Sequence, residues 1–466
     1  MMTRMFGLTA VCAAVFALAA CGPGNTAPPG NSGTGNTPVA NNGGGNDTVE
    51  NGNGGDSRFN AVDSRKAQVQ AAWTYLKTQY NKPPSQDDPR GLMSGWGAKS
   101  MNVPYTAMVL QGLAGTDVWK SDDAMITDSV KWLLDVQEPT GAWSYMPGVD
   151  SLRGIRAVYI TSIMAQLLSD LNKLDAWKGK LDNNIARAVD YLKQSQVGNP
   201  EGPAGDYDEK SVGFGGWAYS KEEIDDSVKA RGKPPANMST TSFAIDALHA
   251  CGISEDDPLW QDALTFLKRN QNAGEVQDEG FEAFAKVKNA DGATEEKKLK
   301  MAGRGSKDYG GAIYSEETSM ADGYDTNEDG TVTLYSYGSM TYNLLRSFLF
   351  AGLKKDSIPV KLAWGWIQNN YTVERVPGFR KPEQYDMGLY YYYMSMAKTL
   401  DAFGADVVAE PERGLEHDWR LDLIKELESR QKDDGSWIND NHDRWQENSK
   451  VLCTAYALMA LKHTSP

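Results

Sequence analysis

Histidine and cysteine are scarce, since the 466 residues contain only 4 of each. So few ligating side chains argue against a zinc-cluster fold and against a disulfide framework. Positive charge is also in short supply, because 47 lysines and arginines stand against 62 acidic residues and leave a net charge of −15. A chain this acidic lacks the electrostatic footprint of a nucleic-acid-binding protein, so we expect no nucleic-acid partner.

Long apolar runs are absent after the first twenty residues, so no later segment predicts a membrane-spanning helix. Residues 1–20 carry Arg4 ahead of an apolar run that ends in small residues, which is typical of a signal peptide. Leu18-Ala19-Ala20-Cys21 resembles the bacterial lipobox, which implies that Cys21 is lipid-modified and becomes the N-terminus. We therefore expect a cell-envelope lipoprotein, at the outer membrane or the periplasmic face, that contacts the membrane through its lipid anchor. An ordinary cleaved signal peptide, the alternative, would still export the protein.

Residues 21–57 are almost entirely Gly, Asn, Pro, Thr, Ser and Ala up to about position 56. Such a composition cannot bury enough apolar surface to fold. A flexible chain of this length has a reach of about 30–36 Å. We therefore expect a disordered tether over residues 21–57 and one folded domain over residues 58–466.

The rest of the chain contains a two-part repeat. Its first part is a helix with a charged side, a Gln near its end, and then a turn that contains Gly and usually Trp. The copies are Gln79 with Gly95-Trp96, Gln137 with Gly141-Ala142-Trp143, Gln196 with Gly215-Gly216-Trp217, Gln271 with Gly310–Tyr314, Trp366 with Pro377-Gly378-Phe379, and Gln431 with Gly435-Ser436-Trp437. We expect these helices to form an outer layer, with Trp143, Trp217 and Trp437 buried near their Gly turns.

The second part is an apolar helix in which one residue, here called the register residue, is followed seven positions later by Leu or Phe. The register residues are Thr106, Thr161, Thr241, Thr341, Tyr393 and Thr454. Seven residues are close to two helical turns, so both positions share one face. Helices that are apolar nearly all round are buried. Six outer and six inner helices predict an all-α fold, an α/α toroid, because closure buries the faces that an open end exposes. An open helical solenoid is the alternative.

The segment Gln431–Trp437, Gln-Lys-Asp-Asp-Gly-Ser-Trp, resembles the repeat of squalene-hopene cyclases and of protein prenyltransferase β subunits. Its five relatives extend the resemblance over most of residues 60–466. The resemblance is closer to bacterial prenyltransferase or squalene-oxidase repeat proteins, and it is carried by residues 338–342, 388–393 and 443–445. We expect this chain to be a lipoprotein of that type. The resemblance implies an α/α toroid with an aromatic-lined central cavity, but it does not by itself imply cyclase activity.

The residues that the family uses for catalysis are missing. Triterpene cyclases place Asp-x-Asp-Asp-Thr at the start of an inner helix, and none of the inner-helix starts here holds an aspartate pair. The near-match Glu223–Ser227 precedes a polar segment and is interpreted as part of a solvated lid. Prenyltransferases need zinc ligands, but His249 and Cys251 point to different faces of their helix. We expect no required cofactor, and the sequence leaves open whether the protein is an enzyme.

The expected cavity is outlined by side chains at the starts of inner helices and in the turns before them. Asp386 is the candidate catalytic acid, although a carboxylate in that place is more often a helix cap. Arg444, Trp445 and Glu447 can meet a polar or anionic group at the mouth, or form a rim salt bridge and a turn instead. The full set of cavity candidates is Trp217, Thr240, Tyr342, Tyr390, Tyr391, Arg444, Trp445 and Glu447.

Two insertions, residues 197–238 and 272–337, lengthen the loops between an outer helix and the next inner one. Long insertions on one face of a ring favour that face as the binding side. The second insertion contains Asp325, Asn327 and Asp329, spaced as in the first half of a calcium-binding loop over residues 325–336. The twelfth position is Ser336 instead of Glu, and a β-hairpin turn rich in Asp, Asn and Gly has the same pattern. Both a calcium site and a small β-hairpin therefore remain open.

Two classes of function are compatible with the sequence. The first is an exported toroid that binds an apolar or isoprenoid small molecule without cyclising it, since the aspartates of the cyclase motif are missing. The second is a carbohydrate-active or purely structural envelope protein, because α/α toroids also carry polysaccharide lyases and hydrolases. A lyase or hydrolase would need paired acidic or basic residues along a cleft, and the sequence offers only isolated candidates. Protein partners cannot be inferred from the sequence.

Overall fold

The computed structural model describes residues 54–81, 95–97, 102–145, 154, 156–289 and 291–465. Cys21, the expected signal peptide and nearly all of the expected tether lie outside the described residues. Contacts between Cα atoms divide the chain into residues 1–57 and residues 58–466. The two-part repeat lies in the second unit.

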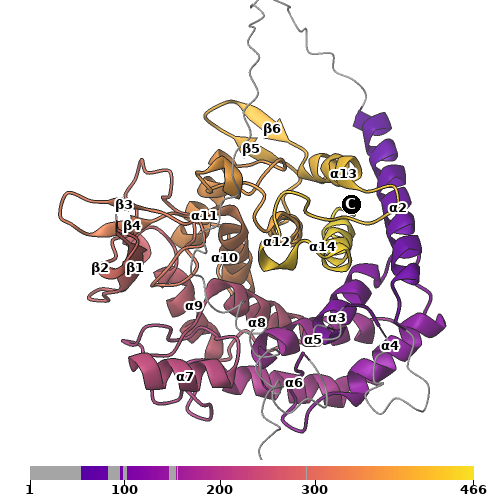
Figure 1. Ribbon diagram of the computed structural model, residues 1–466, viewed down its shortest axis with the longest axis horizontal. Coiled ribbons are helices and arrows are strands. Elements are labelled where there is room, and N and C mark those ends of the chain that lie inside the picture. The colour runs from indigo at the N-terminus through magenta and orange to yellow at the C-terminus, as the bar shows by residue number, and fades with distance from the viewer. Residues whose placement is uncertain are drawn as a thin grey trace, which may run out of the picture. The chain divides into compact units, whose positions relative to one another are not determined.

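Helices dominate the described part of this unit, and they alternate between two layers (Figure 1). The outer layer consists of α2 (Gly54–Thr78), α4 (Ala124–Asp135), α6 (Asp182–Gln194), α9 (Leu259–Arg269), α11 (Ile358–Asn369) and α13 (Trp419–Arg430). The inner layer consists of α3 (Asn102–Leu113), α5 (Ala157–Asn172), α8 (Met238–Ala250), α10 (Gly338–Phe350), α12 (Leu389–Phe403) and α14 (Lys450–Lys462). Short 3₁₀ turns follow at Gly274–Val276, Pro382–Gln384 and Arg444–Gln446.

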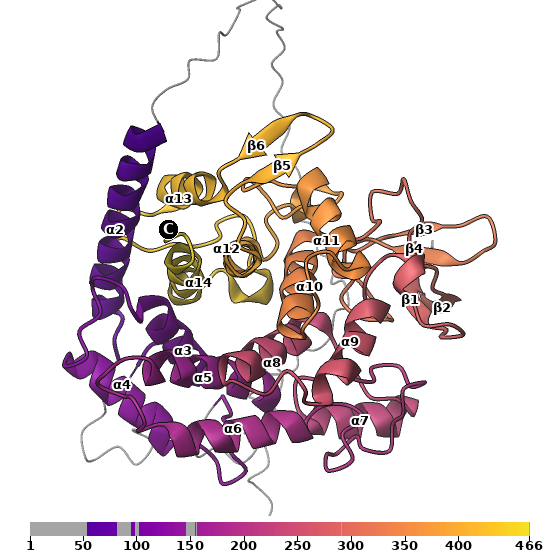
Figure 2. The same ribbon diagram turned by 180° about the vertical axis from the view of Figure 1, so that it is seen from behind.

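The inner helices form a closed ring, which Figure 2 shows from behind. Each packs against the next one in the order α3, α5, α8, α10, α12 and α14, and α14 packs back against α3. The last contact closes the ring and excludes the open solenoid. The prediction of an α/α toroid with six inner and six outer helices is therefore confirmed.

Burial explains why the two layers differ in sequence. Every residue of α3 is buried, and α8 and α10 bury their first eleven residues, so these helices are apolar nearly all round. Outer helices bury one face only, as α6 does through Ala188, Val189 and Leu192. No helix among the described residues is long and apolar enough to cross a membrane.

The pattern of the repeat has the same structural cause in the units that contain Trp143, Trp217 and Trp437. The backbone N–H of Trp143 donates to the hydroxyl of the register residue Thr161 over 3.0 Å, and its indole N–H donates to the carbonyl of Leu133 over 2.7 Å. Trp217 and Trp437 make the same two bonds in their own units. All three tryptophans are 0% exposed, as predicted. Each Trp thus ties its turn to an inner and an outer helix.

The Gln and Gly of the repeat join neighbouring units. The Gln431 side-chain amide donates to Gly435 O over 2.9 Å and to Gln68 O on α2 over 3.0 Å, which links the sixth unit to the first. Gly435 has a φ of 87°, and a Cβ there would stand 2.3 Å from Ala71 O. A larger residue would push α2 away, which explains why the turn needs glycine.

The insertions carry small elements of their own. The first contains α7 (Lys221–Arg231), a polar helix outside both layers, and the second contains two antiparallel hairpins, β1 (Phe284–Lys288) with β2 (Thr294–Lys298) and β3 (Tyr324–Thr326) with β4 (Val332–Leu334). The expected hairpin is therefore present. A third hairpin, β5 (Val408–Glu410) with β6 (Leu415–His417), follows α12 and was not predicted from the sequence.

Candidate functional site

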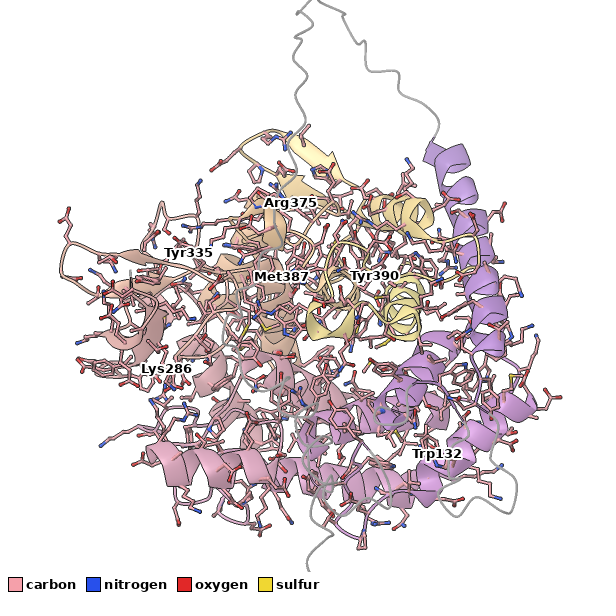
Figure 3. All side chains as sticks on the ribbon, in the orientation of Figure 1. Trp132, Lys286, Tyr335, Arg375, Met387 and Tyr390 are labelled. Carbon is pink, nitrogen blue, oxygen red and sulfur yellow. The ribbon has the colours of Figure 1, made fainter. Side chains whose placement is uncertain are left out.

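Several of the predicted cavity residues are packed inside the protein. Trp217, Thr240, Tyr342 and Tyr390 are at most 1% exposed. Trp217 is engaged in the turn of its repeat, and Tyr390 donates from its hydroxyl to Ile438 O over 3.3 Å. Thr240 lies in the first turn of α8, and its backbone N–H donates to the side-chain oxygen of Asn237 over 2.9 Å. Figure 3 places Tyr390 beside the inner helix α12, whereas Trp132 lies on the outer helix α4.

Glu447 caps the start of α12. One of its carboxylate oxygens accepts from the backbone N–H of Tyr391 over 2.9 Å, and the other accepts from the Asn439 amide over 2.8 Å. Burial raises the pKa of this carboxyl to about 7, although the hydrogen bonds oppose the shift. Because α12 begins after Gly388, which has no side chain to offer as a cap, Glu447 supplies the missing acceptor from a distant loop.

Asp386 lies in the turn before α12 and not on the helix, which begins at Leu389. It is partly exposed, and its carboxylate accepts a hydrogen bond from the side-chain amide of Asn441. Beside this turn the Arg444 guanidinium stacks on the ring of Trp445, 4.7 Å from its centroid. Trp445 is 37% exposed and has a φ of 57°, and a Cβ on Gly388 would stand 3.0 Å from its ring. Trp445 is therefore an exposed aromatic side chain held in place against the turn before α12.

The residues of the expected calcium loop form the turn of the hairpin β3–β4. Asp329 pairs with Lys300 at 2.8 Å, Asn327 donates to the hydroxyls of Thr331 and Thr333, and Asp325 accepts from the Tyr335 hydroxyl. Within the part of the chain that the structure describes, no three His, Cys, Asp or Glu side chains are grouped so that they could hold a metal ion. The hairpin turn, which was the alternative interpretation, accounts for the sequence pattern.

Aromatic side chains from opposite sides of the ring meet within the first two turns of the inner helices. The ring of Tyr159 on α5 lies 4.7 Å from Phe243 on α8, and Phe243 lies 6.2 Å from Tyr391 on α12. Tyr391 in turn lies 5.9 Å from Tyr456 on α14. The contact between Phe243 and Tyr391 crosses the ring, since α8 and α12 are not neighbours in it, whereas the other two contacts join neighbouring inner helices. The aromatic face is therefore on the ring axis.

The two insertions extend this aromatic face. Tyr219 from the first insertion lies 5.8 Å from Tyr159, and its hydroxyl is 2.8 Å from that of Tyr314 in the second insertion. The aromatic cluster is defined here as Tyr159, Tyr219, Phe243, Tyr314, Tyr391 and Tyr456. Four of the six, namely Tyr159, Tyr219, Tyr314 and Tyr391, are partly exposed although they belong to the interior of the ring. The cluster therefore has an accessible surface at the starts of the inner helices.

Tyr159, Tyr314 and Tyr391 are neutral hydrogen-bonding groups at physiological pH. Burial raises the pKa of Tyr159, Tyr314 and Tyr391 above the ordinary value of a phenol. Tyr391 accepts a hydrogen bond from the Asn343 amide over 2.9 Å and is 3.2 Å from the Ser239 hydroxyl. The cluster thus combines apolar ring faces with fixed polar groups, which is the usual composition of a small-molecule site.

Arg156 lies at the edge of the cluster, with its guanidinium 4.4 Å from the centroid of the Tyr219 ring. Its φ of 54° is rare for a residue with a side chain. Glu223 on α7 accepts from the backbone N–H of Tyr219 over 2.7 Å, and burial raises the pKa of its carboxyl. Ser220 accepts from the N–H of Glu223, so this carboxylate belongs to the cap of α7.

Below the aromatic cluster, the inner helices carry a buried polar layer, defined here as Gln166, Asp246, Arg346 and Lys398. Arg346 binds both carboxylate oxygens of Asp246, over 2.8 and 3.0 Å. The Lys398 ammonium donates to Asp246 over 2.7 Å and to Gln166 over 2.8 Å. Burial alone would raise the pKa of Asp246, but Arg346 and Lys398 outweigh it and hold the pKa below its usual value. Asp246 is therefore ionised, and the polar layer as a whole joins four inner helices.

The polar layer was missed in the sequence, although a signal for it exists. Each member lies five positions after the register residue of its inner helix. The six residues at that position are Gln111, Gln166, Asp246, Arg346, Lys398 and Met459. One position of the repeat therefore supplies a whole layer around the axis, and three of its six members are charged.

A separate surface pocket lies between the end of α5, one side of α6 and the turn after α8. Its volume is about 500 Å³, and its lining includes Ser169, Lys173, Asp182, Asp190 and Cys251. Burial raises the pKa of the Cys251 thiol to about 12, so this cysteine is not a thiolate at neutral pH. The pocket contains none of the cavity residues predicted from the sequence.

Comparison with known proteins gives limited matches. A family model described as the A-macroglobulin TED domain matches residues 60–204. This model is not that of the squalene-hopene cyclase repeat, so membership of that family stays a prediction. No curated protein matches the chain.

Solved structures of the type II terpene cyclase MstE from Scytonema are similar to the chain. An alanine variant in complex with the product merosterolic acid A has a TM-score of 0.46 at 12% identity, and the alignment covers 87% of this chain and 98% of that one. The apo enzyme has a TM-score of 0.46 at 14% identity, with 86% and 97% covered. A second variant, with the substrate geranylgeranyl dihydroxybenzoate, has a TM-score of 0.43 at 12% identity, with 87% and 99% covered. The helix contacts described above, and not these similarities, establish the toroid.

Proposed function

We propose that this protein binds an apolar small molecule, of isoprenoid type or similar, on the aromatic cluster at the ring axis, and that it does not cyclise this molecule. The observation that carries the proposal is the aromatic cluster itself. Rings from four inner helices and both insertions meet there, and four of them keep accessible surface. Apolar and aromatic surface with a few fixed polar groups favours a ligand of mixed character.

The carboxylates near the cluster support binding rather than protonation chemistry. Protonating an alkene requires a strong acid that is free to deliver its proton to the substrate. Glu447 is held by the start of α12, Glu223 by the cap of α7, and Asp246 by two cations. Each of these groups is therefore engaged in holding the fold together.

Binding is tested by calorimetry with geranylgeraniol and squalene, using the full-length protein and the variant Tyr391→Ala. Tyr391 contacts Phe243 and Tyr456, so its loss removes the middle of the cluster, and we expect the affinity to fall at least about tenfold. Tyr324→Ala on the hairpin β3–β4 is the matched control and should bind as the wild type does. Equal affinity in all three proteins would place the ligand elsewhere, and the absence of binding to the wild type would refute the proposal.

The absence of cyclisation needs its own assay. The protein is incubated with squalene and with shorter isoprenoids, and the extract is searched for cyclic products by mass spectrometry. We expect unchanged substrate. A cyclic product that disappears in Asp386→Asn would show that the protein is a cyclase after all.

We also propose that the protein is an exported lipoprotein anchored through Cys21, because the sequence around Cys21 resembles a lipobox and is followed by a tether-like composition. The Cys21→Ser variant should lose the lipid and leave the membrane fraction. Unchanged membrane retention of Cys21→Ser would contradict this proposal without affecting the proposal on binding.

A further inference from the structure

The polar layer beneath the aromatic cluster carries one more positive charge than negative charge. Arg346 and Lys398 share the single carboxylate of Asp246, and the three side chains are 1%, 9% and 2% exposed. The carboxylate of Asp170 also acts electrostatically on Lys398. It does not balance the layer, because it already pairs with Lys173 and Lys462. A buried charge without a counter-charge is costly, so this layer would gain from one further anion.

The hydrogen bonds show which of the two cations still has a donor that can bind such an anion. A guanidinium has five N–H donors, and Arg346 uses them on the two oxygens of Asp246, on Ser395 O, on the Thr399 hydroxyl and on Asn343. An ammonium has three donors, and the Lys398 bonds to Asp246 and Gln166 account for two of them. Among the described residues the third donor of Lys398 has no acceptor, so it remains for a ligand.

A second observation comes from Ser395. Its side chain is 0% exposed, and its hydroxyl has no hydrogen-bond partner among the described residues. Ser395 lies one turn after Tyr391 and one turn before Lys398, so the three residues share one face of α12. A buried hydroxyl without a partner destabilises the folded protein, and a ligand oxygen at this position would remove that cost.

The polar and aromatic parts of the axis are continuous with each other. The Lys398 ammonium is 5.7 Å from the centroid of the Phe243 ring, and Phe243 belongs to the aromatic cluster. Asn343 links the two parts as well, because it donates to the Tyr391 hydroxyl and accepts from Arg346. A molecule lying on the aromatic cluster would therefore bring one of its ends to Lys398 and Ser395.

We propose that the axis site takes an apolar molecule with a single carboxylate, and that this carboxylate accepts hydrogen bonds from Lys398 and Ser395. The proposal rests on the proposed function and names the class of its ligand. One excess positive charge is balanced by one carboxylate. A diphosphate carries about three negative charges, and one excess positive charge would leave most of them without a partner in this buried layer.

The test compares three ligands with the same C20 isoprenoid chain: geranylgeranoic acid, geranylgeraniol and geranylgeranyl diphosphate. Calorimetry on the full-length protein should show the acid binding at least about tenfold more tightly than the alcohol, since hydrogen bonds to charged groups are the stronger ones. The diphosphate should bind more weakly than the acid. A diphosphate that binds most tightly would overturn the argument from charge.

Variants separate the role of Lys398 from general effects on folding. Lys398→Met should abolish the preference for the acid and leave the affinity for the alcohol within about twofold. Ser395→Ala should reduce the affinity for the acid about threefold to tenfold, because it removes one donor without disturbing the ion pairs. Lys425→Met, which changes an exposed lysine on the outer helix α13, is the matched control and should bind all three ligands as the wild type does.

The possible failures can be told apart. If the wild type binds geranylgeraniol but gains nothing from the carboxylate, this inference is overturned and the proposed function stands. If Lys398→Met does not fold, an unchanged affinity of Ser395→Ala for the acid still overturns it. If the folded wild type binds none of the ligands, the proposed function fails and this inference fails with it.

Discussion

Asp246 is predicted to be the residue on which the polar layer depends most strongly. Asp246→Asn keeps the size of the side chain but removes the carboxylate that pairs with both Arg346 and Lys398. Both cations would then stand in the interior without a counter-charge, where Arg346 is 1% exposed and Lys398 is 9% exposed. Breaking a buried ion pair on one side costs about 3–5 kcal/mol, and we expect a loss in the free energy of unfolding of this size.

Lys398→Met gives the comparison that makes the prediction specific. It leaves the two-point pairing of Arg346 with Asp246 intact, and it removes the excess positive charge. Its main cost is the Gln166 side-chain oxygen, which loses its partner, and such a loss is worth about 1–3 kcal/mol. We therefore expect Asp246→Asn to be clearly less stable than Lys398→Met.

The pH dependence of the same variants follows from Lys398. Burial lowers the pKa of this ammonium although Asp246 opposes the shift, and removal of Asp246 would lower it further. A base whose pKa is lower in the folded state than in the unfolded state makes stability rise with pH, up to its unfolded value of about 10.4. The difference in the free energy of unfolding between the wild type and the less stable Asp246→Asn should therefore become smaller between pH 7 and pH 10.

The free energy of unfolding of the wild type, Asp246→Asn and Lys398→Met is measured by urea denaturation followed by tryptophan fluorescence. The buried tryptophans report on the inner and outer layers together. Urea is preferred to guanidinium because it does not screen charges. If Lys398→Met were as destabilised as Asp246→Asn, or if the deficit of Asp246→Asn did not depend on pH, the charge balance assigned to the polar layer would be wrong.

Three further predictions concern the repeat and the cap of α12. Thr161→Val should lower the free energy of unfolding by about 1–3 kcal/mol in urea denaturation, because the buried N–H of Trp143 loses its acceptor; an unchanged midpoint would contradict this role. Gly435→Ala should lower the melting temperature, because Gly435 has a φ of 87° and a Cβ there would stand 2.3 Å from Ala71 O. Gly115→Ala should lower it less, because a Cβ on Gly115 would meet no atom within 4 Å. Glu447 has a pKa of about 7, raised by burial, so its stabilising contribution is complete below its unfolded value near 4.5 and is lost as the pH rises through about 7. Glu447→Gln should flatten the decline in stability between pH 5 and pH 7.5, and a parallel decline in both proteins would refute that assignment.

The fold was accessible from the sequence because its information is local and repeated. A Gln, a Gly, a Trp and a register Thr recur in fixed order, and each contributes a hydrogen bond that the structure shows, such as those of Trp143 with Thr161 and Leu133. The alternation of apolar and partly charged helices predicted the two layers. Closure could be predicted only from the number of units, and the contact between α14 and α3 confirms it.

Only part of the candidate site could be predicted from the sequence. Tyr391 was predicted to line the cavity, and it lies in the aromatic cluster, because tyrosines at the start of an apolar helix stand out. The polar layer was not predicted, because Asp246 and Arg346 are 100 positions apart and each looks like an isolated charge in an apolar helix. The role of Glu447 depends on a loop that folds back on a helix 56 positions earlier, which no local pattern reveals.

The central claim is that the ligand occupies the ring axis, and photo-crosslinking tests it most directly. An isoprenoid probe with a diazirine at one end is bound to the full-length protein, irradiated, and mapped by mass spectrometry of peptides. We predict labels on the segments that contain Tyr159, Tyr219 and Tyr391, and competition by unlabelled ligand. Labelling confined to the surface pocket around Ser169 and Cys251, or labelling without competition, would contradict the account.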